Sequence, residues 1–225
     1  MKISWKSESI MWVLLAGMFA LAAMTWSWAP ERIPVHWNLH GQVDRHGGRF
    51  EGLFAIPLAA LGIYVLMLLV PRIDPGRANY PGFRGAFTTL RLALVVFLAA
   101  LYGVMHLWLR GIEVRVGTVV PWLVGAVFVV VGNLLGKVRP NWFVGIRTPW
   151  TLSSKESWAR THRVGGWVFV VEGLAFMAAG LIQAAWAFYA ACSLLLVGVL
   201  GLVVYSYLVW RGDPDKVPPA DTLPA

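Results

Sequence analysis

Apolar residues gather in six stretches of the chain, and polar residues gather in the segments between them. A stretch of about 17–25 apolar residues can cross the hydrocarbon core of a bilayer as a helix. Because lipid offers the backbone no hydrogen-bonding partner, each stretch must satisfy its own polar groups and is predicted to be helical. The pattern predicts an all-α, polytopic membrane protein. The predicted transmembrane helices cover residues 10–28, 53–70, 88–109, 118–135, 164–183 and 186–209.

The composition supports this fold class. The chain has 225 residues, of which 58% are hydrophobic and 13% are charged, whereas about a quarter of a soluble domain is charged. The net charge of +8 comes from basic loops, which membrane proteins retain on the cytoplasmic side, so it does not indicate nucleic-acid binding. The single cysteine, Cys192, lies in an apolar stretch and has no partner for an intramolecular disulfide.

The distribution of Lys and Arg predicts the orientation. Most of these residues fall in the N-terminus, the second and fourth connecting segments and the C-terminus. The positive-inside rule therefore places both termini and the segment 136–163 in the cytoplasm, and the loop 30–52 outside. The proline-rich tail 211–225 is predicted to be disordered. The basic residues assigned to the outer side are Arg32, Arg45, Arg49, Arg110 and Arg115.

The outer loop carries candidate metal ligands. His36, His40 and Asp44 follow one another at intervals of four residues, which on a helix would place them on one face, as metal ligands often are. Pro34 and Gly41 disfavour a helix there, but an irregular loop can also supply imidazole and carboxylate ligands to a divalent metal. The alternative is a polar turn whose His and Asp side chains hydrogen-bond the backbone. No other cofactor is predicted.

The segment 136–163 is the longest polar interruption in the second half of the chain. Pro140 and Pro149 prevent one continuous helix through it, because each removes a backbone donor and restricts the preceding residue. Ser153 and Glu156 have the spacing of a capping box. The segment is therefore predicted to be a tight loop followed by a short helix lying at the membrane surface.

Polar residues inside the apolar stretches include Arg91, Asn133 and Glu172. Glu172 lies near the middle of its stretch, where an unpaired charge is costly. It is expected to be protonated or to meet a donor, and Arg91 is the candidate partner. Such residues mark functional sites in membrane proteins, but a buried pair can also serve only to set helix packing.

Two motifs resemble those of a known family. Ile33-Pro34-Val35-His36-Trp37-Asn38, followed by Gly41 and Asp44-Arg45, resembles the N-terminal module of bacterial SdpI-type membrane proteins. The segment PNWFVGIRTPWTL at 140–152, followed by Trp158, Thr161-His162-Arg163 and Gly165-Gly166, resembles their C-terminal module. The resemblance divides the membrane domain into a two-helix module at 10–70 and a four-helix module at 88–209.

The resemblance implies a non-enzymatic, multi-pass protein of a bacterial plasma membrane. Members are related to an immunity protein that protects a sporulating cell from its own secreted killing peptide and holds a transcriptional repressor at the membrane. The implied partners are the lipid bilayer, a secreted peptide toxin outside and a repressor inside. The candidate binding residues are Asn141, Arg147, Thr148, Pro149, Trp150, Trp158 and His162 in the cytoplasmic segment, with His36, Asn38, Gly41 and Asp44 in the outer loop.

Physical chemistry leaves the roles of these residues open. Arg147 offers a planar fork of donors for a carboxylate, a phosphate or loop carbonyls, and Asn141 is placed to close a turn. The alternative is that the segment merely folds and anchors itself through interfacial tryptophans. Two other functions stay open: a metal-dependent membrane enzyme using His36, His40, Asp44 or His46, and a small carrier centred on Glu172. The sequence contains no nucleotide-binding loop, acyl-transfer triad or zinc-binding helix motif.

Overall fold

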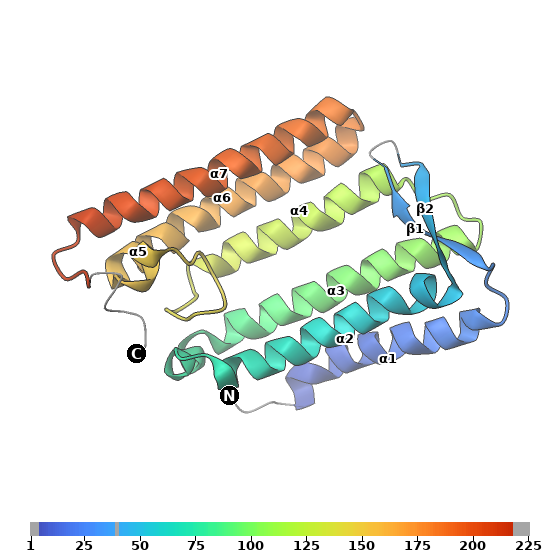
Figure 1. The fold of residues 1–225 in the computed structure, drawn as a ribbon, viewed down its shortest axis with the longest axis horizontal. Coiled ribbons are helices and arrows are strands. Elements are labelled where there is room, and N and C mark those ends of the chain that lie inside the picture. Colours follow the sequence, from blue (N-terminus) through green and yellow to red (C-terminus); the bar gives the residue numbers. More distant parts are fainter. Residues whose placement is uncertain (1–4, 39–40, 218–225) are drawn as a thin grey trace.

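The computed structural model describes residues 5–38 and 41–217. Among these residues, six helices are long and apolar enough to cross a membrane, which confirms the predicted helices (Figure 1). These helices are α1 (Trp5–Trp26), α2 (Arg49–Ile73), α3 (Arg84–Leu109), α4 (Val116–Leu135), α6 (Lys155–Ile182) and α7 (Ala185–Gly212). The shorter helices are η1 (Arg77–Phe83), a 3₁₀-helix, and α5 (Pro149–Leu152).

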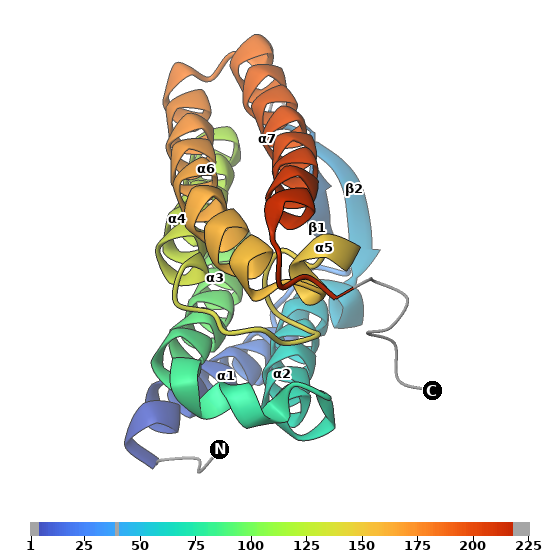
Figure 2. The same ribbon diagram turned by 90° about the vertical axis from the view of Figure 1, so that its left-hand side faces the viewer.

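The helices form two sets of three that lie next to each other. Buried apolar residues of α1, α2 and α3, among them Met11, Leu53 and Val95, make one core. Helices α6 and α7 lie side by side, with α4 against α6 (Figure 2). Helix α3 packs on α1 and α2 and also contacts α4, so it connects the two sets. The division into modules at 10–70 and 88–209 stays a prediction.

Glycines let α4 and α6 approach closely. A Cβ at Gly125 would lie 2.4 Å from the carbonyl oxygen of Gly173, and a Cβ at Gly132 would lie 2.6 Å from that of Gly166. Side chains at these positions would therefore push the two helices apart. Small residues at such contacts are the usual means of helix association in membranes, where van der Waals packing replaces the hydrophobic effect.

The polar segments lie at the two ends of the helices. At one end, termed the hairpin end, β1 (Arg32–Trp37) and β2 (Val43–Gly48) form an antiparallel sheet. This hairpin was not predicted, because Pro34 and the glycines at 47 and 48 weaken the alternation expected of strands. It rests on α2, where a Cβ at Gly52 would lie 2.6 Å from the Ile33 side chain. The other end, termed the loop end, carries η1, α5 and residues 136–154.

Helix α6 differs from its prediction in two respects. It is one helix from Lys155 to Ile182, so the predicted separate surface helix is the first part of a membrane-spanning one. Its N-cap is Ser154, whose hydroxyl accepts a hydrogen bond from Ser157 N at 2.9 Å. The predicted capping box of Ser153 and Glu156 was therefore wrong by one residue, because the preceding turn of α5 holds Ser153, whose hydroxyl donates to Pro149 O at 2.7 Å.

The predicted tail is only partly within the described residues. Residues 211–212 end α7, and residues 218–225 lie outside the described residues. Between them, Val217 N donates a hydrogen bond to Ser153 O at 3.0 Å, and the Ser154 hydroxyl donates to the Asp213 carboxylate. The described part of the tail is thus bound to the junction of α5 and α6 by these hydrogen bonds.

Candidate functional site

Residues 136–154, termed the signature loop, fold around the side chain of Asn141. This side chain is 2% exposed. Its oxygen accepts hydrogen bonds from Phe143 N at 2.9 Å and Val144 N at 2.7 Å. Its nitrogen donates to Arg139 O and Val144 O, both at 2.9 Å. The predicted turn-closing role of Asn141 is thus confirmed, and these four bonds use the side chain's hydrogen-bonding capacity.

His162 holds the second half of the signature loop to α6. Ile146 N donates to His162 Nε2 at 3.0 Å, while His162 Nδ1 contacts Trp158 O at 2.8 Å. An acceptor at Nε2 places the proton of a neutral ring on Nδ1. Gly145 has φ +111°, and a Cβ there would lie 2.3 Å from His162 Nε2. Glycine is therefore required for the loop to pass so close to the ring. Nε2 accepts the hydrogen bond from the loop, while Nδ1 contacts the backbone of α6.

Hydroxyl groups join the signature loop to α7. Thr148 caps α5 in a capping box with Thr151. The Thr148 hydroxyl also lies 3.0 Å from the Ser206 hydroxyl on α7. Next to this contact, Ser157 Oγ of α6 donates to Ser206 O at 2.8 Å. Trp158 Nε1 donates to Val138 O at 2.9 Å, which closes the start of the loop onto α6. Of the predicted binding residues, Asn141, Thr148, Trp158 and His162 thus have buried contacts that fold the loop.

The remaining predicted residues of the loop lie nearer the surface. Arg147 is exposed and donates from Nη1 to Trp142 O at 2.6 Å, so one arm of its fork binds a loop carbonyl, as was considered from sequence. Pro149 is exposed at the first position of α5, where its missing N–H costs nothing. Trp150 is half-buried against Tyr207, with ring centroids 5.2 Å apart. These three residues form the accessible part of the predicted site.

Asp74 is a part of this site that sequence reasoning missed. Its buried carboxylate accepts hydrogen bonds from Gly76 N at 2.6 Å, Tyr80 Oη at 2.8 Å and Trp142 N at 3.1 Å. Nearby, Asn79 Nδ2 donates to Pro140 O at 2.7 Å. The connection between α2 and α3 is therefore bound to the signature loop. The available signal was the Asp-Pro-Gly turn at 74–76, but the sequence reading of that segment considered only its Lys and Arg residues.

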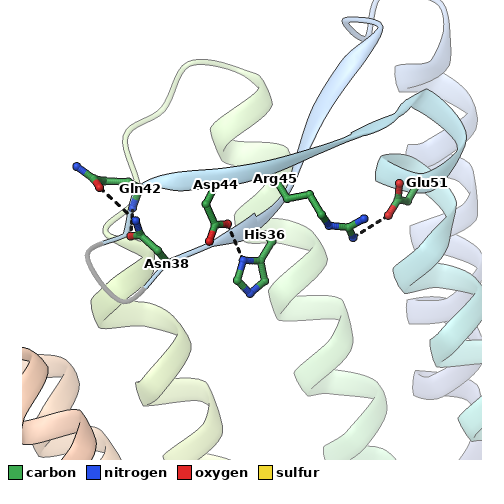
Figure 3. A network of polar contacts seen from close by, with 6 residues as sticks. All are labelled: His36, Asn38, Gln42, Asp44, Arg45 and Glu51. Atoms are coloured by element: carbon green, nitrogen blue, oxygen red, sulfur yellow. Dashed lines mark hydrogen bonds and ion pairs between the residues drawn. The ribbon is translucent and has the colours of Figure 1, made fainter.

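The hairpin brings several predicted outer-loop residues together (Figure 3). His36 Nδ1 lies 2.6 Å from Asp44 Oδ1, joining β1 to β2. Asn38 Oδ1 accepts from Gln42 N at 3.0 Å, and Gly41 has φ +73°. Asn38 and Gly41 therefore build the turn. These contacts agree with a structured polar turn, although its His–Asp contact joins side chains rather than bonding the backbone.

The predicted metal ligands lie only partly within the described residues. His36 and Asp44 are adjacent, but His40 lies outside the described residues. Within residues 5–38 and 41–217, no group of three or more His, Cys, Asp or Glu residues is arranged to hold a metal ion. A divalent metal at His36, His40 and Asp44 stays a prediction.

A cleft of about 780 Å³ lies under the hairpin. Its walls come from β1, from the hairpin ends of α2, α3 and α4, and from the turn between α6 and α7. Most of the wall is apolar, and charged groups at its rim include Arg45, Glu51 and Arg115. Arg45 and Glu51 form an ion pair at 2.8 Å. The cleft thus combines an apolar interior with a charged rim at one end of the helices.

Arg91 has a different partner from the one predicted. Its buried guanidinium pairs with Glu8 on α1, and it lies over the Tyr64 ring with 5.7 Å to the centroid. Tyr64 Oη donates to the other Glu8 oxygen at 2.9 Å. The predicted pairing of Arg91 with Glu172 was therefore wrong. Glu8 was overlooked because it precedes the apolar stretch that begins at residue 10.

Glu172 and Asn133 occupy different surroundings. Glu172 is 1% exposed on α6, and a Cβ at Gly198 of α7 would lie 3.0 Å from Glu172 Oε1, so this glycine makes room for the carboxyl group. Within the described residues, Glu172 Oε2 has no hydrogen-bond partner. Asn133 is exposed and donates to Val129 O of its own helix at 2.8 Å, which satisfies its amide locally.

These features define a class of protein. Six apolar helices with polar structure at both ends make the chain a multi-pass helical membrane protein. The model of the SdpI/YfhL protein family matches residues 137–209, which hold most of the signature loop, α6 and most of α7. The resemblance read from the sequence is confirmed. A second model, a domain of unknown function termed DUF1648, matches residues 13–61.

One curated relative extends this similarity over most of the chain. The Immunity protein SdpI of Bacillus subtilis (strain 168) is 25% identical to it over 170 residues, which are 75% of this chain and 78% of the relative. No solved structure matches the chain. The similarity supports a membrane protein of the immunity type.

Proposed function

We propose that this protein protects a bacterial cell against a secreted antimicrobial peptide and that it does so by binding rather than by catalysis. The observation that carries the proposal is the similarity to an immunity protein over 75% of the chain. The geometry of the signature loop supports a non-catalytic role. The side chains of Asn141, Thr148 and His162 are used in holding the loop together.

The proposed orientation places the loop end in the cytoplasm and the hairpin end outside the plasma membrane. The excess of Lys and Arg in the segments of the loop end supports this orientation. The peptide would then meet the hairpin end first. The signature loop would face cytoplasmic proteins.

We further propose that the signature loop holds a transcriptional repressor at the membrane. Its buried hydrogen bonds pre-organise it, so a partner would lose little conformational entropy on binding. The side chains that remain accessible are suited to a protein contact. They include Arg147, Trp150 and Phe143, which is 39% exposed.

The immunity proposal is tested by expressing the chain in a bacterium that is sensitive to secreted peptide toxins. We expect survival to rise against at least one toxin of a panel, compared with cells carrying an empty vector. The variant Arg147→Glu, on the loop side, should protect as well as the native chain if toxin and repressor bind at opposite ends. Killing that is unchanged across the panel, at confirmed membrane expression, would refute the proposal.

A carrier centred on Glu172 is the competing function, and the unpartnered Oε2 of this buried carboxyl group is the observation in its favour. A carrier needs a path from solvent to that group. The cleft at the hairpin end is lined by Ala179 of α6 and by Gln183, which caps that helix, and not by Glu172. This separation favours immunity by binding over transport.

A further inference from the structure

The free edge of β1 borders the cleft under the hairpin. Successive side chains of a strand point to opposite faces of its sheet. A cleft beside one face would therefore contact every second residue, whereas a cleft along the edge of the strand contacts consecutive residues. The cleft is lined by Pro34, Val35, His36, Trp37 and Asn38 without a gap, whereas β2 contributes only Arg45. The described part of the sheet has two strands, so β1 has β2 on one side and the cleft on the other.

A bulge makes this edge short and irregular. The pairing passes from Pro34 opposite His46 to His36 opposite Arg45, and Val35 has no partner residue in β2. Pro34 has no N–H to donate. A bulge and a proline discourage edge-to-edge pairing of whole strands. The backbone around Val35–Trp37 can still pair with a short peptide segment. The edge therefore suits a few residues of an extended chain rather than a full strand.

The opposite wall of the cleft provides apolar contacts. It is built by Ile56 of α2, Leu101 and Met105 of α3, Val120 of α4 and Phe188 of α7. An extended peptide paired with a strand edge directs alternate side chains to the same side. Side chains directed away from β2 would thus meet this apolar wall, which favours a peptide rich in apolar residues.

Arg115 supplies a cation at the rim. Its side chain is exposed and lines the cleft. In the described part of the chain no hydrogen bond or ion pair holds its guanidinium, in contrast to Arg45, which pairs with Glu51. A guanidinium binds a carboxylate through two parallel hydrogen bonds, so the free C-terminus of a peptide is the complementary group.

We propose that this cleft binds the C-terminal segment of an extended, mainly apolar peptide. The peptide backbone pairs with the free edge of β1 near Val35, and its terminal carboxylate binds Arg115. The inference deepens the proposed function, on which it rests for the existence of a peptide ligand. The proposed site lies at the hairpin end, where the edge of β1, the apolar wall of the cleft and the guanidinium of Arg115 are close together.

The test uses the full chain in lipid nanodiscs and a displayed library of random short peptides with free C-termini. We expect selection to enrich apolar sequences. An enriched peptide is then synthesised in three forms: unmodified, with alternate backbone N-methyl groups, and with a C-terminal amide. N-methylation should weaken binding about tenfold or more, because it removes strand pairing worth about one or two hydrogen bonds. Amidation should weaken binding about tenfold, the effect of losing one charge-assisted contact.

Two arginine variants make the test specific. Arg115→Gln should weaken the unmodified peptide and remove its advantage over the amide. Arg110→Gln is the matched control, because Arg110 is exposed in the same connection between α3 and α4 but does not line the cleft. Equal effects of the two variants would overturn the assignment of Arg115.

The remaining outcomes each count against the proposal. If no peptide is enriched, or if an N-methylated peptide or a fatty acid of similar length binds as tightly as the unmodified peptide, the cleft is not a strand-pairing site. Binding is measured on purified protein, so it is independent of the immunity assay. Peptide binding without protection would refute the proposed function alone, and protection without peptide binding would refute this inference alone.

Discussion

The carboxylate of Asp74 accepts a hydrogen bond from the backbone N–H of Trp142 at 3.1 Å, although the two residues are 68 positions apart. This contact joins the segment after α2 to the signature loop. Trp142 lies within the region matched by the SdpI/YfhL family, whereas Asp74 lies outside it, in the connection between α2 and α3. The loop thus depends on a residue outside its own motif.

Asp74→Ala should destabilise the protein strongly. The substitution leaves the N–H groups of Gly76 and Trp142 and the hydroxyl of Tyr80 without their acceptor, and each buried donor left unsatisfied costs about 1–3 kcal/mol. Thermal unfolding in detergent, followed by tryptophan fluorescence, measures the effect. Asp215→Ala, at an exposed position, is the control. A melting temperature equal to that of the control would show that the carboxylate contributes nothing.

The pair of Glu8 and Arg91 should behave as a unit. Removing one partner leaves a buried charge uncompensated, which costs about 3–5 kcal/mol, so Glu8→Gln and Arg91→Met should each destabilise the protein. The double variant should recover part of the loss, because it buries no charge. The free energies of unfolding of the four proteins form a double-mutant cycle. Additive losses would mean that the two side chains are not coupled.

The described tail should detach in acid. The Ser154 hydroxyl, and to a smaller extent the Asp215 backbone N–H, donate hydrogen bonds to the Asp213 carboxylate. They stabilise its charged form and hold the pKa of this carboxyl below its usual range. A folded-state pKa below the unfolded value gives a stabilisation that is complete above about pH 4 and is lost as the pH falls through the folded value. Hydrogen exchange of residues 213–217 should therefore rise at low pH. Asp213→Asn should remove this pH dependence, and a native-like profile in that variant would contradict the assignment.

Glu172→Gln distinguishes a packing role from transport. Glutamine keeps the size of the side chain beside Gly198 but cannot exchange a proton. We expect protection against the toxin and thermal stability to stay near native values, whereas Glu172→Lys should reduce stability by introducing a fixed buried charge. Loss of protection in a stably folded Glu172→Gln protein would instead support a carrier.

Cysteine labelling tests the orientation. In a Cys192→Ser background, Gln42→Cys at the hairpin end and Lys155→Cys at the loop end both occupy exposed positions. An impermeant maleimide added to intact cells should label the first protein and not the second, because the positive-inside rule retains the basic end inside. Permeabilised cells provide the control, in which both should react. The reverse pattern would invert the proposed placement of toxin and repressor.

The sequence by itself determined the membrane class, the transmembrane helices, the resemblance to the SdpI/YfhL family and the turn at Asn141. Each depends on information that acts locally: hydropathy over one helix length, the spacing within a motif, or a side chain bonding backbone groups two or three residues away. The helix cap was missed by one residue, because either of two neighbouring serines can cap a helix and the end of α5 decides between them.

The tertiary structure alone decided which distant polar groups meet. The predicted depths of Arg91 and Glu172 in the membrane allowed the two residues to pair. The packing of α3 against α1 instead places Arg91 beside Glu8. The contact of Asp74 with Trp142 and the cleft between β1 and the helix ends likewise require helices far apart in the sequence to be neighbours. Hydropathy predicts that a helix crosses the membrane. It does not predict which neighbouring helix packs against it or which of its faces is buried. Those choices follow from close packing between whole helices.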